Sequence, residues 1–410
     1  KEMKKVWDKW TRIALVKRIL VGLILGAILG IAVPQATGIA ILGDVFVSAL
    51  KAIAPLLVFF LVVSSLCNAG KSHGGVIKTV IILYMFSTVL AAVIAVFASM
   101  AFPVKMTLAN AATDTSAPQG IVEVLNNLLL NVVANPVSSL VNANYVGILM
   151  WAVLLGLAFR AADKMTKKVL ADVADGISMV VTWIINLAPF GIFGLVFNTV
   201  STNGLDIFTT YGKLLLLLVG CMLFIYFVTN PLLVYWCIRQ NPYPLIFHCL
   251  KRSALTAFFT RSSAANIPVN MKVCEEMGLD RDTYSVTIPL GATINMDGAA
   301  ITITVMTMAT AFTLGIHVDI PTAIILSLLA ALSACGASGV AGGSLLLIPM
   351  ACSLFGISDD ISMQVVAVGF IIGVVQDSVE TALNSSSDLL LSASAEFRQW
   401  RLEGKEIKFK

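Results

Sequence analysis

Three carboxylates lie close together near the C-terminal end of a long apolar segment. This segment reads ISMQVVAVGFIIGVV from residue 361 and continues as QDSVETALNSSSDLL, which contains Asp377, Glu380 and Asp388. At 100° per residue, an α-helix places these three side chains, together with Thr381 and Asn384, on one face about 100° wide. The spacing therefore predicts a polar stripe along one side of an otherwise apolar helix.

A stripe of carboxylates needs a counter-charge if the helix is surrounded by lipid. A carboxylate at the middle of a bilayer costs several kcal/mol unless it is paired or hydrated. No Lys or Arg lies within the segment itself. We therefore expect the positive charge to come from something bound, which could be an inorganic cation, an ammonium group or protons on the acids.

A second polar segment offers oxygen ligands for a cation. The stretch PLGATINMDGAA, residues 289–300, holds Asn295 and Asp297 between Pro289, Gly291 and Gly298. Proline and glycine favour an interrupted helix, in which backbone carbonyls are released from helical hydrogen bonds. Carbonyl, amide and carboxylate oxygens together suit a hard cation of group 1. The alternative is that Asn295 and Asp297 only satisfy each other.

The composition indicates the solvent around these segments. Of the 410 residues, 58% are hydrophobic and 12% are charged, and the mean hydropathy is +0.92. Soluble domains are roughly 45–50% apolar and about 25% charged. Uncharged stretches long enough to cross a bilayer occur at 19–43, 52–70, 79–102 and 214–238. Because about 20 apolar residues span the hydrocarbon core, we predict a polytopic helical membrane protein.

The basic residues predict the orientation of the spans. We expect spans near 13–33, 41–67, 77–102, 120–159 (interrupted), 170–199 and 208–238. With the N-terminus inside, only four of the 27 basic residues fall outside the inner segments, namely Lys51, Lys105, Lys213 and Arg261. The positive-inside rule then places both termini in the cytoplasm. The basic excess thus fits a membrane orientation, and nucleic acid is not an expected partner.

After residue 240, two apolar segments are interrupted at their centres. The uncharged stretch 320–358 is long enough for two crossings, but SACGASGVAGGS at its middle is too rich in glycine for a continuous helix. The earlier stretch FFTRSSAANIPVNM, residues 258–271, has polar residues at its centre. Backbone without helical bonds is tolerated at membrane depth only where protein buries it or it lines a cavity. These features favour two helical hairpins. Each would enter and leave on one side of the membrane, and the two would enter from opposite faces.

The two interrupted segments occupy corresponding places in the second half of the chain. We predict re-entrant hairpins at about 243–273 and 319–357, which alternate with spans at about 282–314 and 361–395. Paired interrupted segments are typical of the binding site of a secondary transporter. The alternative is that the glycines only allow close packing of helices.

Four motifs of this half resemble one known family. The motifs are TRSSAANIPV, GATINMDGA, GVAGGS and the pattern D-x-x-E-T-x-x-N-x-x-x-D of residues 377–388. They closely resemble the dicarboxylate/amino acid:cation symporter family, which has the glutamate-transporter fold. The resemblance covers essentially the whole chain and is strongest to the bacterial branch of sodium-coupled serine and threonine symporters.

The resemblance implies an all-α polytopic membrane protein with eight transmembrane helices, two re-entrant helical hairpins, inverted repeats and a homotrimeric assembly. It divides the chain into a six-helix N-terminal half at 1–240, a core transport unit at 241–397 and a cytoplasmic tail at 398–410. The first, second, fourth and fifth spans would form a static scaffold. The other spans and both hairpins would form a transport domain that moves as an elevator across the bacterial inner membrane.

The resemblance also implies a ligand set. The substrate would contact Ser262 and Ser263 in the first hairpin tip, Val340 in the second, and Asp377, Glu380, Thr381 and Asn384 in the last span, with Asp377 on the α-amino group. One sodium ion would bind Gly291, Asn295, Asn384 and Asp388. A second would bind Thr293, Met296, Ala334, Cys335 and Ala337. A third would bind Tyr84, Ser87, Thr88, Asn295 and Asp297.

Two departures from the family pattern bear on specificity. Carriers of acidic amino acids place an Arg where this sequence has Glu380, and a Thr where it has Ala299. A guanidinium suits a side-chain carboxylate, whereas Glu380 would repel one. A short neutral side chain with a hydroxyl donor would satisfy Glu380. We therefore expect sodium-coupled import of serine and threonine, with sodium as the coupling ion, no cofactor and no enzymatic activity.

Three other functions remain as alternatives. An ion channel would need an open path for several ions, which two closed hairpins disfavour. An intramembrane serine hydrolase would need a base near its serine, and no histidine lies in the polar segments. A proton-coupled symporter, using Asp377 and Glu380, is the closest alternative, although the oxygen-rich clusters favour sodium.

Overall fold

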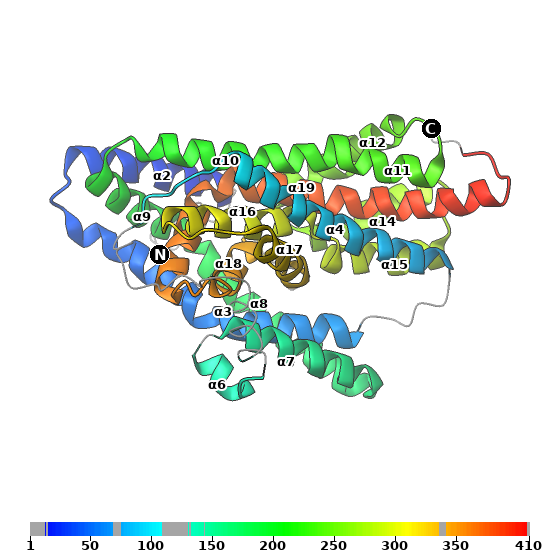
Figure 1. The fold of residues 1–410 in the computed structure, drawn as a ribbon, viewed down its shortest axis with the longest axis horizontal. Coiled ribbons are helices and arrows are strands. Elements are labelled where there is room, and N and C mark those ends of the chain that lie inside the picture. The colour runs from blue at the N-terminus through cyan, green and yellow to red at the C-terminus, as the bar shows by residue number, and fades with distance from the viewer. Residues whose placement is uncertain are drawn as a thin grey trace, which may run out of the picture.

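Helices make up all the regular structure in the part of the chain that the structure describes. A computed structural model describes residue 13 and residues 15–68, 75–108, 130, 133–142, 144–335 and 342–407. Figure 1 shows an elongated bundle in which most helices run along the long axis. Within these residues no strand occurs, which confirms the all-helical class.

Five helical segments of these residues are long and apolar enough to cross a membrane. They are Gly75–Ala101, Lys164–Asn186, Ile207–Ile238, Arg281–Thr313 and Asp359–Leu402. Shorter apolar helices of 10–17 residues lie before and between them along the chain. The fold is therefore that of a helical membrane protein.

Two long helices near the N-terminus pack against two helices, α8 (Lys164–Asn186) and α9 (Ala188–Asn203), which follow each other directly in the chain. Helix α2 (Leu15–Ala32) packs along α9, and α3 (Ile41–Asn68) packs against both α9 and α8. We call α2, α3, α8 and α9, together with α7 (Tyr145–Ala158), the scaffold helices. The single span expected at 170–199 is therefore two helices. Leu187 separates them, and α9 carries Pro189 in its first turn, where the missing N–H costs no hydrogen bond.

Glycines bring α2 and α9 into backbone contact. A Cβ added at Gly26 of α2 would lie 2.6 Å from the carbonyl oxygen of Phe193. The same face of α2 carries Gly22, where an added Cβ would lie 2.2 Å from the carbonyl oxygen of Pro189. Small residues at a helix interface permit this approach in a membrane, so the two helices form one unit.

The interrupted span expected at 120–159 is described in part. It contains α6 (Pro136–Val141) and α7, which continues into a short 3-10 turn at Phe159–Ala161. Helix α7 packs against α3. Residues 120–129, 131, 132 and 143 of this expected span lie outside the described residues.

Two further helices flank the polar core. Helix α4 (Gly75–Ala101) contacts α15, α16, α17 and α19. Helix α10 (Ile207–Phe224) continues through a π-helical turn at Ile225–Thr229 into α11 (Asn230–Ile238). Both α10 and α11 pack along the C-terminal helix α19, so the third and sixth expected spans lie beside the C-terminal half.

The first interrupted segment folds as a helical hairpin. Its descending arm contains α12 (Tyr243–Cys249), a π-helical turn at Leu250–Ala254 and α13 (Leu255–Thr260), and its returning arm is α14 (Ser263–Glu276). The chain reverses at Arg261, a left-handed residue with φ of 52°. Ser262 then caps α14, because its hydroxyl accepts a hydrogen bond from the Ala265 N–H at 3.2 Å.

The second hairpin and the broken span complete the core. Helix α15 (Arg281–Ile294) and helix α16 (Asp297–Thr313) are separated at Asn295 and Met296. The second hairpin comprises α17 (Ile320–Ala334), a 3-10 turn at Gly343–Leu347 (η5) and α18 (Ile348–Ser353). Helix α19 (Asp359–Leu402) runs through the centre of this half and contacts α10, α11, α13, α14, α15, α16 and α18.

Candidate functional site

The predicted polar stripe of α19 is buried inside the protein. Its five members are between 1% and 6% exposed; they are Asp377, Glu380, Thr381, Asn384 and Asp388. The neighbours that bury them are the two hairpins and the junction between α15 and α16. The stripe therefore faces polar segments rather than lipid, as the helical periodicity predicts.

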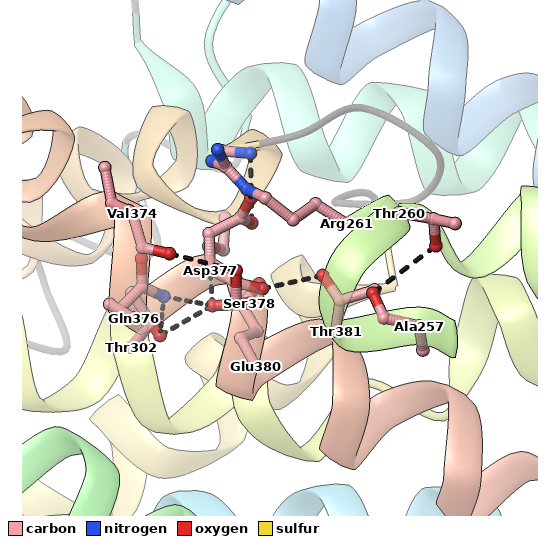
Figure 2. A network of polar contacts seen from close by, with 12 residues as sticks. Ala257, Thr260, Arg261, Thr302, Val374, Gln376, Asp377, Ser378, Glu380 and Thr381 are labelled. Carbon is pink, nitrogen blue, oxygen red and sulfur yellow. Dashed lines mark hydrogen bonds and ion pairs between the residues drawn. The ribbon is translucent and has the colours of Figure 1, made fainter. Parts of the chain in front are cut away.

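Asp377 is paired with an arginine from the first hairpin. The Arg261 Nε donates to Asp377 Oδ2 at 2.6 Å. On the other carboxylate oxygen, the Gly342 N–H of the second hairpin donates to Asp377 Oδ1 at 3.1 Å. Figure 2 shows Arg261 reaching from the hairpin tip onto Asp377. One carboxylate thus holds both hairpins.

The prediction that the counter-charge of the stripe comes only from something bound was wrong for Asp377. The prediction depended on the absence of basic residues from the same span, whereas Arg261 lies 116 positions earlier in the chain. A signal was present in the sequence, because Arg261 is the only charged residue between Arg252 and Lys272. A lone charge at a hairpin tip inside the membrane indicates a buried partner.

Glu380 is held by three donors from three different elements. Its Oε2 accepts from Thr302 Oγ1 at 2.7 Å, from Ser344 Oγ at 2.9 Å and from Gln376 Nε2 at 2.5 Å. Figure 2 shows Gln376 and Thr302 converging on this carboxylate. The sequence prediction named Glu380 but missed the three donors, because two of them come from distant segments.

Thr381 uses its hydroxyl hydrogen within its own helix. The Thr381 Oγ1 donates to the Asp377 carbonyl at 2.7 Å.

Ser263 begins α14 beside the tip of the first hairpin and is 7% exposed. Val340, expected at the second hairpin tip, and Ala337 lie outside the described residues.

A second buried cluster surrounds Asp388. The Asn295 Nδ2 donates to Asp388 Oδ1 at 2.9 Å and to Ser387 Oγ at 2.8 Å. The Tyr84 hydroxyl donates to the Asp388 carbonyl at 2.8 Å. The Asn295 Oδ1 is buried and has no hydrogen-bond partner among the described residues. A carboxylate and an unpartnered amide oxygen are ligands that suit a hard cation.

Glycine allows this cluster to close. A Cβ at Gly291 would lie 2.8 Å from Asp388 Oδ1 and 2.9 Å from the Tyr84 hydroxyl. The Gly291 carbonyl accepts the helical bond from the Asn295 N–H at 2.9 Å. Gly291 and Pro289 therefore lie inside α15, and the interruption of the helix is confined to Asn295 and Met296. Beyond it, the Gly298 N–H donates to Asn384 Oδ1 at 2.7 Å.

Asp297 lies on the opposite side of the break and faces α4. Its carboxylate accepts from Ser87 Oγ at 2.7 Å and from Thr88 Oγ1 at 3.1 Å. Asp297 is fully buried. Asn295 contacts α19, whereas Asp297 contacts α4. The alternative in which these two side chains only satisfy each other was therefore wrong.

The residues expected at a second cation position come together in part. The Cys335 Sγ, at the end of α17, lies 3.8 Å from the Ile294 carbonyl at the end of α15. Met296 Sδ accepts from Asn384 Nδ2 at 3.5 Å. The Thr293 hydroxyl donates to the Leu290 carbonyl at 2.7 Å, and Ala334 is buried at the end of the hairpin arm. Two helix ends thus meet here, where free carbonyls are common.

Comparison with known proteins decides the family. The family model described as the sodium:dicarboxylate symporter family matches residues 15–396. The chain belongs to this family. A relative from Bifidobacterium adolescentis, named serine/threonine transporter SstT, is 57% identical over 99% of this chain and 95% of its own length. Two relatives of the same name from Streptococcus thermophilus strains are 55% and 56% identical over 97% of this chain and 100% of their own length.

Membership confirms the resemblance seen in the motifs. The members are transporters, so the chain is not an enzyme, and sodium is the coupling ion of the family rather than a bound cofactor.

Proposed function

We propose that this protein imports serine and threonine by symport with sodium ions. The observation that carries the proposal is the arrangement of α19, where one carboxylate contacts both hairpins and a second, about three turns further along the same face, lies in an oxygen-rich cluster. The first, Asp377, suits an ammonium group, and the second, Asp388, suits a hard cation. Relatives over nearly the full length carry the name serine/threonine transporter.

In this proposal the substrate binds between the hairpin tips. Its α-ammonium takes the Asp377 Oδ2 and competes there with the Arg261 guanidinium, 2.6 Å away. Its carboxylate binds the tips at Ser262–Ser263 and Val340, and Thr381 and Asn384 complete the site. The contacts of both hairpins with Asp377 support a substrate-binding role for this residue. A ligand that replaces Arg261 on Asp377 would directly change the contacts of the first hairpin.

Three groups of oxygen ligands bind sodium in this proposal. Gly291, Asn295, Asn384 and Asp388 form the first group. Thr293, Met296, Ala334, Cys335 and Ala337 form the second. Tyr84, Ser87, Thr88, Asn295 and Asp297 form the third. The buried amide oxygen of Asn295, without a partner in the described part of the chain, supports a cation between the first and third groups.

Glu380 selects the side chain of the substrate. Its carboxylate lies one helical turn from Asp377 and is 5% exposed. A second carboxylate, as in aspartate, would be repelled, because a buried pair of like charges is costly. A hydroxyl can instead donate to Glu380, which favours serine and threonine.

We propose the architecture that the family resemblance implies: eight transmembrane helices and two re-entrant hairpins per subunit, in a homotrimer in the bacterial inner membrane with cytoplasmic termini. Residues 1–240 form the six-helix N-terminal half, residues 241–397 the core transport unit and residues 398–410 the cytoplasmic tail. The first, second, fourth and fifth spans form the static scaffold, and the third and sixth spans, both hairpins and the last two spans move as an elevator. The second hairpin packs against the scaffold helices through η5 on α3 and α18 on α7.

The replacement Asp377→Asn tests the substrate site. We expect it to abolish serine binding, because it removes the charge that binds the ammonium, and to leave sodium binding largely intact. Calorimetry with each ligand on the purified protein distinguishes the two effects. Normal serine binding by the variant would contradict the proposed function.

A further inference from the structure

The three donors on Glu380 all converge on one of its two oxygens. Thr302 Oγ1, Ser344 Oγ and Gln376 Nε2 lie within 2.9 Å of Oε2. None of the hydrogen bonds found within the described residues reaches Oε1. A carboxylate oxygen has about two lone-pair directions, so Oε2 is saturated and Oε1 remains the acceptor of this side chain.

The donors form a connected and buried group. The Gln376 Nε2 also donates to Thr302 Oγ1 at 2.7 Å. Thr302 and Gln376 are fully buried, and Ser344 is 1% exposed. Thr302 comes from α16, Ser344 from η5 of the second hairpin and Gln376 from α19. Three elements must be in place together for Glu380 to adopt this orientation.

The position of Glu380 relative to Asp377 gives Oε1 a function. Residues three apart on a helix face the same side with their Cβ atoms about 5–6 Å apart. A serine whose ammonium lies on Asp377 carries its β-hydroxyl one carbon further along. That hydroxyl therefore falls within reach of Glu380, and Oε1 is the oxygen that can accept it.

We infer that Thr302, Ser344 and Gln376 are positioning residues for substrate specificity: they hold Oε2 of Glu380 so that Oε1 accepts the β-hydroxyl of the substrate. This inference rests on the proposed serine and threonine transport. All three donors bind Oε2, so Oε1 is left to accept a hydrogen bond from the substrate. A substrate without a hydroxyl group cannot donate that hydrogen bond. Since Ser344 belongs to the second hairpin, that hairpin supplies one of the three donors.

The test compares serine with alanine, which differs only by the hydroxyl. Sodium-driven uptake into proteoliposomes gives kcat/KM for each substrate with the wild type, Thr302→Val and Thr302→Ser. We expect Thr302→Val to lower the serine-to-alanine ratio by roughly tenfold, the value of one hydrogen bond to a charged group. The loss should lie in KM for serine, with alanine unchanged. Thr302→Ser, which keeps the hydroxyl, should retain the wild-type ratio.

Further variants separate the inference from the proposed function. Ser344→Ala and Gln376→Met should reduce the ratio as Thr302→Val does, and Glu380→Gln should reduce it at least as much. Equal losses of serine and alanine uptake in Thr302→Val would mean a structural role and would overturn the inference. An unchanged ratio in Glu380→Gln with sodium-driven serine uptake preserved would also overturn it, while leaving the proposed function intact. Absence of sodium-driven serine uptake in the wild type would refute the proposed function itself.

Discussion

The replacement Asp388→Asn removes one negative charge from the cluster at the α15–α16 break. In the structure, Asp388 Oδ1 accepts from Asn295 Nδ2 at 2.9 Å, and the carboxylate is 1% exposed. An interaction with a charged group contributes about 1.5–3 kcal/mol. If the bound sodium loses an interaction of this size, its Kd rises roughly 10- to 150-fold. The neutral amide keeps the shape of the side chain, so the change reports on charge.

The assay measures sodium affinity and serine affinity on the same purified variant. Serine affinity at fixed sodium should fall as well, because the coupling between two ligands is reciprocal. At saturating sodium the serine affinity should return toward the wild-type value. Asp175→Asn, on an exposed position of α8, is the matched control and should change neither affinity.

An Asp388→Asn variant with wild-type sodium affinity would refute the reasoning. The Asp388–Asn295 contact would then be a structural hydrogen bond. A loss of serine affinity that excess sodium does not restore would point instead to a direct effect on the substrate site.

Two further variants test the contacts around the site and in the scaffold. In the proposed site, the Arg261 guanidinium competes with the substrate ammonium for Asp377, and Arg261→Gln removes it. Serine at saturating sodium should then bind roughly tenfold more tightly, as expected for one charged hydrogen bond. Weaker binding would mean that Arg261 is itself a substrate ligand. Gly26→Ala forces a Cβ to within 2.6 Å of the Phe193 carbonyl oxygen. This should lower the stability of the protein by about 1–3 kcal/mol and reduce its Tm in detergent. Gly212→Ala, with nothing within 4 Å of the added Cβ, is the control and should leave the Tm unchanged.

The polar stripe was predictable because it depends on local periodicity. Helical spacing alone places Asp377, Asn384 and Asp388 on one face, and the burial of all three agrees. The two interrupted segments were likewise marked by glycine, proline and serine at their centres. The broken span at 289–300 was predicted, although its helix continues through Pro289 and ends only at Ile294.

Pairings between distant segments could not be read from spacing. Arg261 meets Asp377 only because the hairpin tip folds back onto α19, and the φ of 52° at Arg261 depends on that reversal. The same limit applies to Thr302 and Ser344 on Glu380. The separation of Asn295 from Asp297 also depends on the fold, since the break turns one toward α19 and the other toward α4. Periodicity predicts a face of a helix, and tertiary packing selects its partners.

The measurement that tests the central claim most directly is serine uptake into liposomes that contain the purified protein, under an imposed sodium gradient and, separately, under a proton gradient. The account predicts uptake with inward sodium and none with protons alone, because in the proposed site Asp388 and Asn295 supply oxygen ligands for sodium. Uptake driven by protons alone would contradict it, and the coupling would then fall to Asp377 and Glu380.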